Sequence, residues 1–253
     1  MTATAGTAGT AGTVDPQDIA RFSAIAAEWW DPTGKFRPLH RLNPLRLAYI
    51  RDTLCRRLGR DPLAPEPLKG LRIVDIGCGG GLLSEPMARM GATVVGVDAA
   101  ERNVRTAAAH AAETGTPVDY RATTAEALAA SGERFDAVLA MEVIEHVADV
   151  PLFVKSCAEL TAPGGALFLA TLNRTPKSFA LAIVGAEYIL RWLPRGTHNW
   201  RQFLRPGELA AAVRAEGLAI RDLTGITYSP LSDEFRLNPR DLDVNYMGWA
   251  ERA

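Results

Sequence analysis

The chain has 253 residues, of which 47% are hydrophobic and 23% charged, a composition typical of a globular protein with a well-covered core. Its formal net charge of -1 provides no global positive field, which argues against nucleic acid as a partner. The three cysteines are widely spaced and form no CxxC pair, so we expect neither a zinc site nor a disulfide framework, and a cytoplasmic location fits.

Residues 1–14 begin with a low-complexity run of alanine, glycine and threonine, and we expect them to form a disordered tail. This tail lacks the charged start and long apolar core of a signal peptide. It also lacks the arginines of a mitochondrial transit peptide. The remaining residues, 15–253, are expected to form a single domain.

The segment 15–69 is predicted to contain two helices and a linker. Asp15-Pro16 is a favourable helix start, and apolar residues then recur at helical spacing as far as Trp29. Asn43-Pro44 is predicted to start the second helix, and three prolines mark 60–69 as the linker. Because both helices precede the first strand, they are available to cover a pocket.

Two polar residues of this segment, His40 and Arg46, are candidates for contact with such a pocket. A solvated or core-edge position explains either side chain as well as a functional role does. The sequence pattern alone leaves both interpretations open.

Strand and helix alternate from residue 71 to residue 172, which is the signature of an open parallel sheet. The predicted strands cover 71–75, 93–97, 117–120, 135–140 and 166–172. The predicted helices cover about 82–90, 100–114, 125–128 and 149–161. Ligands of such sheets bind outside the carboxyl ends of the strands, so we expect the site at that edge.

The first of these strands runs into a glycine-rich turn at 77–81. Glycine can take positive φ and lets the backbone come close to a bound molecule. The second strand ends in Asp98, about 20 positions beyond the turn, where an acid can accept both hydroxyls of a ribose. A dinucleotide turn needs glycine at its sixth position, which is Leu82 here, so an NAD enzyme is disfavoured. For Cys78, a small side chain that fits the turn is a better explanation than a nucleophile.

The pattern Asp75-x-Gly77-x-Gly79 resembles motif I of the class I S-adenosylmethionine-dependent methyltransferases. The resemblance implies an α/β fold with a doubly wound, mostly parallel seven-stranded sheet whose last strand is antiparallel. It also implies S-adenosylmethionine (SAM) as cofactor, with the turn at its methionine part. Asp75, Gly77 and Gly79 are then cofactor-site residues.

The fourth predicted strand is followed by a polar stretch that contains Glu142, Glu145 and His146. If 142–146 form a helical turn, the spacing i, i+3, i+4 places the three side chains on one side. Two carboxylates and an imidazole can hold a divalent ion, or they can act as a general base with its orienting partner. Methyl transfer to oxygen needs one or both, because a phenol with a pKa of about 10 is scarcely ionised at neutral pH. A structural role for Glu142 is the alternative.

The segment 174–203 reads as an insertion, with a largely apolar run at 179–193 between basic residues. The run is too short to span a bilayer. It suits a helix at a membrane surface or a lid over the site, and a helix buried against the core explains it equally well. A helix at 206–216 and strands near 218–228 and 243–250 complete the expected domain, whose last part is 204–253.

Several stretches outside the cofactor fold resemble the ubiquinone biosynthesis O-methyltransferases, and the similarity runs from about residue 18 to residue 248. These stretches are Trp29-Trp30-Asp31-Pro32, 36–46, 171–175, 184–190, Arg195-Gly196-Thr197-His198 and 243–247. The resemblance implies an enzyme that methylates ring hydroxyls of polyprenylated phenols and catechols at two steps of ubiquinone biosynthesis. The residues it implies as SAM contacts are Arg46, Gly77, Asp98 and Met141.

By the same resemblance, Glu142, Glu145 and His146 match a metal-binding motif, with Mg²⁺ or Zn²⁺ as the ion. A polyprenyl substrate partitions into the membrane, so a bacterial location on the inner face of the plasma membrane is implied, with a ubiquinone biosynthesis complex as a further partner. Two rival functions stay open at this point: an enzyme of the same fold that methylates a carbon or a soluble metabolite, and a cofactor-binding scaffold without turnover.

Overall fold

The computed structural model describes residues 12–189, 196–229 and 232–252. The strands are β1 Arg72–Ile76, β2 Thr93–Asp98, β3 Asp119–Ala122, β4 Phe135–Met141, β5 Thr161–Leu172, β6 Leu218–Ser229, β7 Glu234–Asn238 and β8 Asn245–Arg252. The α-helices are α1 Pro16–Ala24, α2 Arg37–Leu58, α3 Ser84–Arg89, α4 Glu101–Thr114, α5 Ala125–Ala130, α6 Val150–Leu160, α7 Pro176–Ser178 and α8 Pro206–Ala215. The described residues also contain three short 3-10 helices, η1 Ala26–Glu28, η2 Ile144–His146 and η4 Trp200–Gln202. A π-helix, η3, covers Phe179–Ile189.

Within these residues the strands form one mixed sheet in the order β3-β2-β1-β4-β5-β8-β6-β7. The strands from β3 to β5 pair in parallel, and β8 lies antiparallel between β5 and β6. The order reverses at β1, which has β2 on one side and β4 on the other. A crevice at such a switch point is where open α/β sheets bind ligands.

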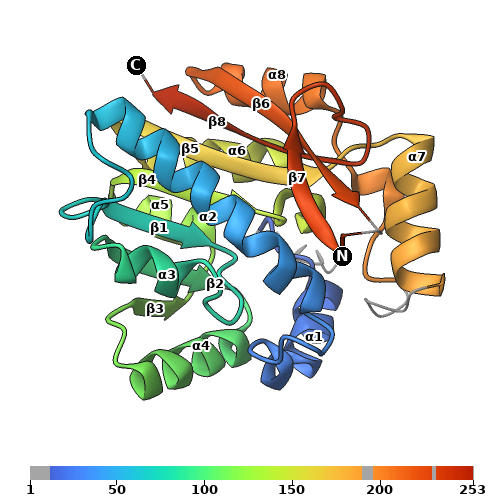
Figure 1. Cartoon of the computed structure of the whole chain (residues 1–253), viewed down its shortest axis with the longest axis horizontal. Helices are drawn as coiled ribbons and strands as arrows, with labels where there is room; N and C mark the ends of the chain where they lie inside the picture. The colour runs from blue at the N-terminus through green and yellow to red at the C-terminus, as the bar shows by residue number, and fades with distance from the viewer. Residues whose placement is uncertain (1–11, 190–195, 230–231, 253) are drawn as a thin grey trace, which may run out of the picture.

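The core lies on both faces of the sheet because neighbouring residues of a strand point in opposite directions. In β1, Val74 packs into the cluster that includes Phe153 of α6. The preceding residue, Ile73, packs into the cluster that includes Ile50 and Leu54 of α2. Figure 1 shows α2 crossing the near face of the sheet while α6 lies behind it. Burial on both faces explains why these strands read as continuous apolar runs.

The expected antiparallel last strand is confirmed as β8, but the sheet has eight strands rather than seven. The additional strand is β7, an edge strand that forms an antiparallel hairpin with β6. Its five residues are largely exposed or half-buried, so they lack the apolar run by which the inner strands were recognised. Tyr228 and Phe235 pair across this hairpin, with ring centroids 5.0 Å apart.

The predicted start of the second helix at Asn43-Pro44 is wrong. The helix α2 begins at Arg37, with Pro38 in its first turn, where a missing N–H costs nothing, and Pro44 lies inside it. Asn43 is buried and its side-chain amide donates to the Leu82 carbonyl at 2.8 Å. This bond ties α2 to the segment that follows the glycine turn.

Residues 1–11 of the expected tail lie outside the described residues. Thr13 and Val14 do not fit the expectation of disorder. The Ala148 N–H donates to the Thr13 carbonyl at 2.7 Å, and Val14 forms a β-bridge with Val147. Thr13 also donates from its backbone N–H and its hydroxyl to Glu126, at 2.6 and 2.8 Å. The chain just before α1 is therefore attached to the loop that follows β4.

The apolar insertion begins with α7 and continues without a break into η3. Phe179, Leu181 and Val184 are 46%, 54% and 39% exposed, so burial against the domain's own core does not describe this helix. The end of the predicted run, 190–193, lies outside the described residues. Among the residues that the structure does describe, none of the helices has the length and apolar character needed to cross a bilayer.

Candidate active site

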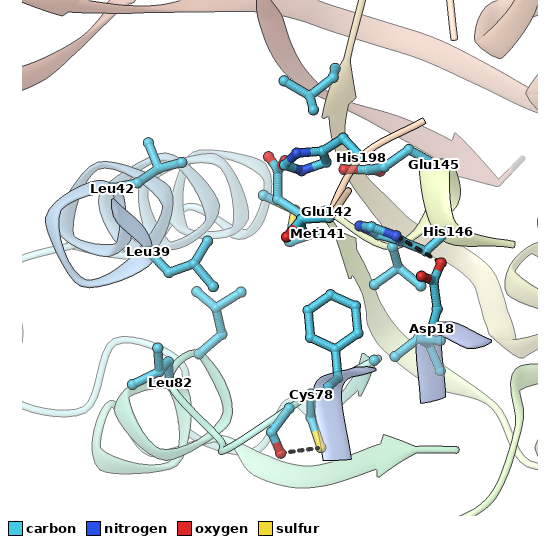
Figure 2. Close-up of a pocket in the computed structure, with 18 of the residues that line it drawn as sticks. Asp18, Leu39, Leu42, Cys78, Leu82, Met141, Glu142, Glu145, His146 and His198 are labelled. Atoms are coloured by element: carbon cyan, nitrogen blue, oxygen red, sulfur yellow. Dashed lines mark hydrogen bonds and ion pairs between the residues drawn. The ribbon is translucent and has the colours of Figure 1, made fainter. Parts of the chain in front are cut away.

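A cavity of about 980 Å³ opens at the carboxyl ends of β1, β2 and β4. Gly77, Asp98 and Met141, one from the end of each of these strands, lie in its wall. Residues of α1, α2 and η3 close it from the other sides. Figure 2 shows Met141, Glu142, Glu145, His146 and His198 along one side of the cavity, with Leu39 and Leu42 of α2 facing them. Residues 15–58 therefore cover the pocket, as their place before the first strand suggested.

The glycine turn needs its glycines for two separate reasons. Gly77 and Gly79 have φ of 70° and 54°, a region that residues with a Cβ seldom occupy. In addition, a Cβ at Gly79 would lie 2.4 Å from the ring of Trp29. Trp29 is itself fixed by its indole N–H, which donates to Asn103 at 3.0 Å. The turn thus packs closely against the N-terminal segment, with no room for a side chain at Gly79.

Asp98 is oriented by three donors at the end of β2. Its Oδ1 accepts from the Ala100 N–H at 2.8 Å and from the Asn103 amide at 3.2 Å, and its Oδ2 accepts from the Gly79 N–H at 3.0 Å. Burial raises the pKa of Asp98, and these bonds oppose the rise. A carboxylate has about four lone-pair sites, so this one keeps acceptor capacity for a ligand hydroxyl.

Asp75 lies beneath the turn and is fully buried, with 2% of its surface exposed. Ser84, the first residue of α3, donates its hydroxyl to Asp75 Oδ2 at 2.7 Å. Burial raises the pKa of Asp75 to about 7, despite the bond from Ser84. The motif I acid therefore joins β1 to α3 and supports the turn from below.

Substitution of Asp75 by asparagine is expected to change the pH dependence of stability. A carboxyl whose folded pKa of about 7 exceeds its unfolded value binds its proton more tightly in the native state. The contribution of this proton to the free energy of unfolding is complete below the unfolded pKa and is lost as pH rises through about 7. Asp75→Asn should therefore gain stability relative to wild type between about pH 5 and about pH 8, by on the order of a few kcal/mol. Urea denaturation of both proteins at the two pH values measures this gain, and an equal difference at both would contradict it.

Arg46 and Glu142 form an ion pair in the cavity wall, with 2.6 Å between Arg46 Nη2 and Glu142 Oε1. The Arg46 side chain is only 3% exposed, and its Nε is buried without a partner among the described residues. Glu142 has φ of 57°, which is unusual for a residue with a Cβ and costs free energy that the surrounding structure must supply. Arg46 is thus a buried cation with donor capacity left for an acidic ligand.

Glu145 and His146 follow in the short helix η2. Glu145 accepts from the Thr171 hydroxyl at 2.9 Å and is 2% exposed, and burial together with the neighbouring Glu142 raises its pKa. His146 points the other way, toward α1, where its Nδ1 lies 3.1 Å from Asp18 Oδ2. Figure 2 shows this pair at the edge of the cavity.

Comparison of the sequence with known proteins identifies the family of this chain. The sequence model of a methyltransferase domain matches residues 47–223. Ubiquinone biosynthesis O-methyltransferases of Sinorhizobium fredii and Parvibaculum lavamentivorans are each 60% identical to the chain, over 94% and 95% of its length and over 96% and 94% of their own. The chain belongs to the ubiquinone biosynthesis O-methyltransferases. It is a SAM-dependent O-methyltransferase, as its resemblance to the family implied.

Solved structures place this O-methyltransferase in the class I fold. Magnesium protoporphyrin IX methyltransferase from Synechocystis PCC 6803, with SAH bound, has a TM-score of 0.60 and 20% identity, covering 87% of this chain and 86% of its own. The PH0226 protein from Pyrococcus horikoshii has a TM-score of 0.62 and 14% identity, covering 92% and 99%. At these identities the likeness is one of fold.

The expected metal site of the O-methyltransferase does not fit the observed arrangement. In residues 12–189, 196–229 and 232–252, no group of three His, Cys, Asp or Glu side chains could hold a metal ion. The expectation assumed one helical turn over 142–146, but Glu142 has a left-handed backbone and η2 starts only at Ile144. As a result Glu142 turns to Arg46 while His146 turns to Asp18.

Two residues that line this O-methyltransferase site were not given a role by the sequence patterns. Asp18 sits on α1, where it reads as an ordinary acid of a helix's first turn. His198 was noted only within the stretch Arg195-Gly196-Thr197-His198, and its ring centroid lies 5.8 Å from that of His146. His40 is placed away from this group, with its Nε2 2.8 Å from the Trp29 carbonyl oxygen.

Proposed function

We propose that this enzyme methylates ring hydroxyls of polyprenylated phenols and catechols at two steps of ubiquinone biosynthesis. The observation that carries the proposal is the 60% identity to relatives named for this activity, over nearly the whole of both chains. One continuous cavity supports it, because the cavity joins the glycine turn and Asp98 to Glu142 and His146.

In this proposal SAM lies across the ends of β1, β2 and β4. Asp98 accepts the ribose hydroxyls, while Gly77 and Gly79 receive the methionine part. Arg46 binds the carboxylate of the methionine part, because a buried guanidinium forms strong hydrogen bonds to a charged acceptor. Met141 contacts the cofactor at the end of β4, and Asp75 acts through the turn that it supports.

His146 serves as the general base. Its Nε2 takes the proton of the substrate hydroxyl, and the oxygen forms a bond to the methyl carbon of SAM. The carbon–sulfur bond breaks with its electron pair going to sulfur, which yields the methyl ether and S-adenosylhomocysteine. Glu142 and Glu145 shape the electrostatic environment of the reacting oxygen in this proposal, and Glu145 has one buried oxygen, Oε1, without a partner among the described residues. Since the three side chains do not fit a Mg²⁺ or Zn²⁺ site as they stand, no step is assigned to a metal.

The apolar part of the cavity wall is proposed to receive the prenyl tail. It comes from α2, from η3 and from the hairpin of β6 and β7. These side chains are Leu39, Leu42, Leu181, Ile226 and Phe235. The substrate class is tested by measuring kcat/KM for a prenylated catechol and for the same catechol without its tail. A clearly higher value with the tail is expected, and equal values would favour a small polar metabolite as the substrate.

The proposal includes peripheral association with the inner face of the bacterial plasma membrane, through the exposed apolar residues of η3. Of the basic residues that flank η3 within the described part of the chain, Arg174 pairs with Glu208 and Lys177 pairs with Asp241 and Asp243, so these two contribute little net charge. Burial of apolar surface should therefore drive binding more than attraction to anionic lipid. A ubiquinone biosynthesis complex is a further partner under this proposal.

Replacement of Phe179, Leu181 and Val184 together by serine is expected to reduce co-sedimentation with lipid vesicles several-fold. Each substitution removes an apolar side chain, whose complete burial would contribute about 1.5–3 kcal/mol to the free energy of binding. Leu63→Ser is the matched control, since Leu63 is 82% exposed and lies in the linker before β1. Equal vesicle binding by wild type and the triple variant would remove membrane docking from the proposal.

A further inference from the structure

We infer that Asp18 of α1 is a positioning residue for His146, and that the first helix thereby completes the catalytic site. The inference rests on the proposed function, in which His146 is the general base. Asp18 accepts a hydrogen bond from Nδ1–H of His146, so that Nε2 is the unprotonated nitrogen that faces the substrate hydroxyl.

The geometry of the pair suits this role. The distance between His146 Nδ1 and Asp18 Oδ2 is 3.1 Å, and each side chain is 14% exposed. Burial alone would raise the pKa of Asp18, but the bond from His146 and the nearby charges of His146 and Arg21 outweigh it and lower that pKa. Asp18 is therefore an ionised acceptor for the Nδ1–H of His146, which fixes the orientation and the tautomer of the imidazole.

The same face of α1 also fixes the plane of the imidazole ring. Phe22 lies one turn after Asp18, and its ring meets that of His146 edge-on, with centroids 5.4 Å apart and an interplanar angle of 89°. His198 lies against His146 with centroids 5.8 Å apart. Figure 2 shows His146 between His198 and Asp18 at the edge of the cavity. The ring is thus confined by packing as well as by its hydrogen bond.

The helix α1 is attached to both loops of the site. Before it, Val14 bridges to Val147, which directly follows η2. Within it, Arg21 forms an ion pair with Asp18 and donates from Nη1 to the Thr197 carbonyl at 3.2 Å. These contacts hold Asp18 in register with His146, although the two residues are 128 positions apart in the sequence.

The test is Asp18→Asn, an uncharged side chain of the same shape. It should lower kcat by about 10²-fold or more, with the KM for the catechol and the affinity for SAM close to wild type, because an asparagine amide can also favour the wrong tautomer. Glu28→Gln is the matched control, since it makes the same chemical change in η1 and breaks only the surface pair with Lys35. This control should keep full activity.

Imidazole ¹⁵N spectra report which ring nitrogen carries the proton, and a purely structural role of Asp18 would leave these spectra unchanged. The His146 signals are assigned by their loss in His146→Ala. Wild type should show a protonated Nδ1, Asp18→Asn a mixture of tautomers, and Asp18→Glu should regain part of kcat. An unchanged kcat and tautomer in Asp18→Asn would overturn the inference, as would a loss of SAM affinity and thermal stability in proportion to kcat. If His146→Ala itself kept full activity, the assignment of the base would fail, which is a distinguishable result.

Discussion

Replacement of His146 by alanine is expected to lower kcat for catechol methylation by roughly 10²- to 10⁴-fold, the usual contribution of a positioned general base. The substrate hydroxyl is scarcely ionised at neutral pH, so removal of the acceptor for its proton leaves a poor nucleophile. The sulfonium of SAM needs no activation, and His146 stands on the η2 side of the cavity rather than at the glycine turn. Stopped assays of S-adenosylhomocysteine formation under saturating SAM measure the effect.

The affinity for SAM is the internal control for His146→Ala and should stay close to wild type in calorimetry. A second check raises the pH, because a catechol that is already ionised needs no base, and the deficit of the variant should shrink in alkaline solution. A variant that turns over at the wild-type rate at neutral pH would exclude His146 as the base.

Asp98→Ala is expected to weaken SAM binding by about 10²-fold or more, because hydrogen bonds to a charged acceptor contribute about 1.5–3 kcal/mol each. The variant also loses the carboxylate that orients the Gly79 N–H and the Asn103 amide, so the turn itself is less well ordered. Calorimetry with SAM and with S-adenosylhomocysteine measures the loss.

The control for Asp98→Ala is Asp119→Ala, which removes an exposed acid from neighbouring β3, where it pairs with half-buried Arg121. That variant should bind SAM like wild type. Asp98→Asn should lie between wild type and alanine, since an amide oxygen keeps one acceptor. Unchanged affinity in Asp98→Ala would contradict the placement of the ribose at the end of β2.

The meeting of Gly77, Gly79 and Asp98 in one cavity wall, where we propose the cofactor, could be predicted because its determinants are local. Gly77, Gly79 and Asp98 lie at the ends of two adjacent strands, and the alternation of strand and helix fixes which strand ends meet. The parallel order around β1 follows from the same pattern. For these residues, short sequence spacing translates directly into closeness in space.

The arrangement around His146, the base in our proposal, could not be predicted in the same way because its contacts join distant parts of the chain. Arg46 meets Glu142 across 96 positions, and Asp18 meets His146 across 128. The spacing of Glu142, Glu145 and His146 suggested one helical face, but the left-handed backbone of Glu142 turns its side chain toward α2 instead. No local pattern encodes a backbone conformation that tertiary contacts impose.

Transfer of a ¹³C-labelled methyl group from SAM to a short-chain prenylated catechol tests the central claim most directly. The claim is that one cavity brings the sulfonium methyl to a ring hydroxyl beside His146. The expected product carries the label in an aryl methyl ether, with one S-adenosylhomocysteine formed for each ether. Label on a ring carbon, or SAM binding without any transfer of label, would contradict the account.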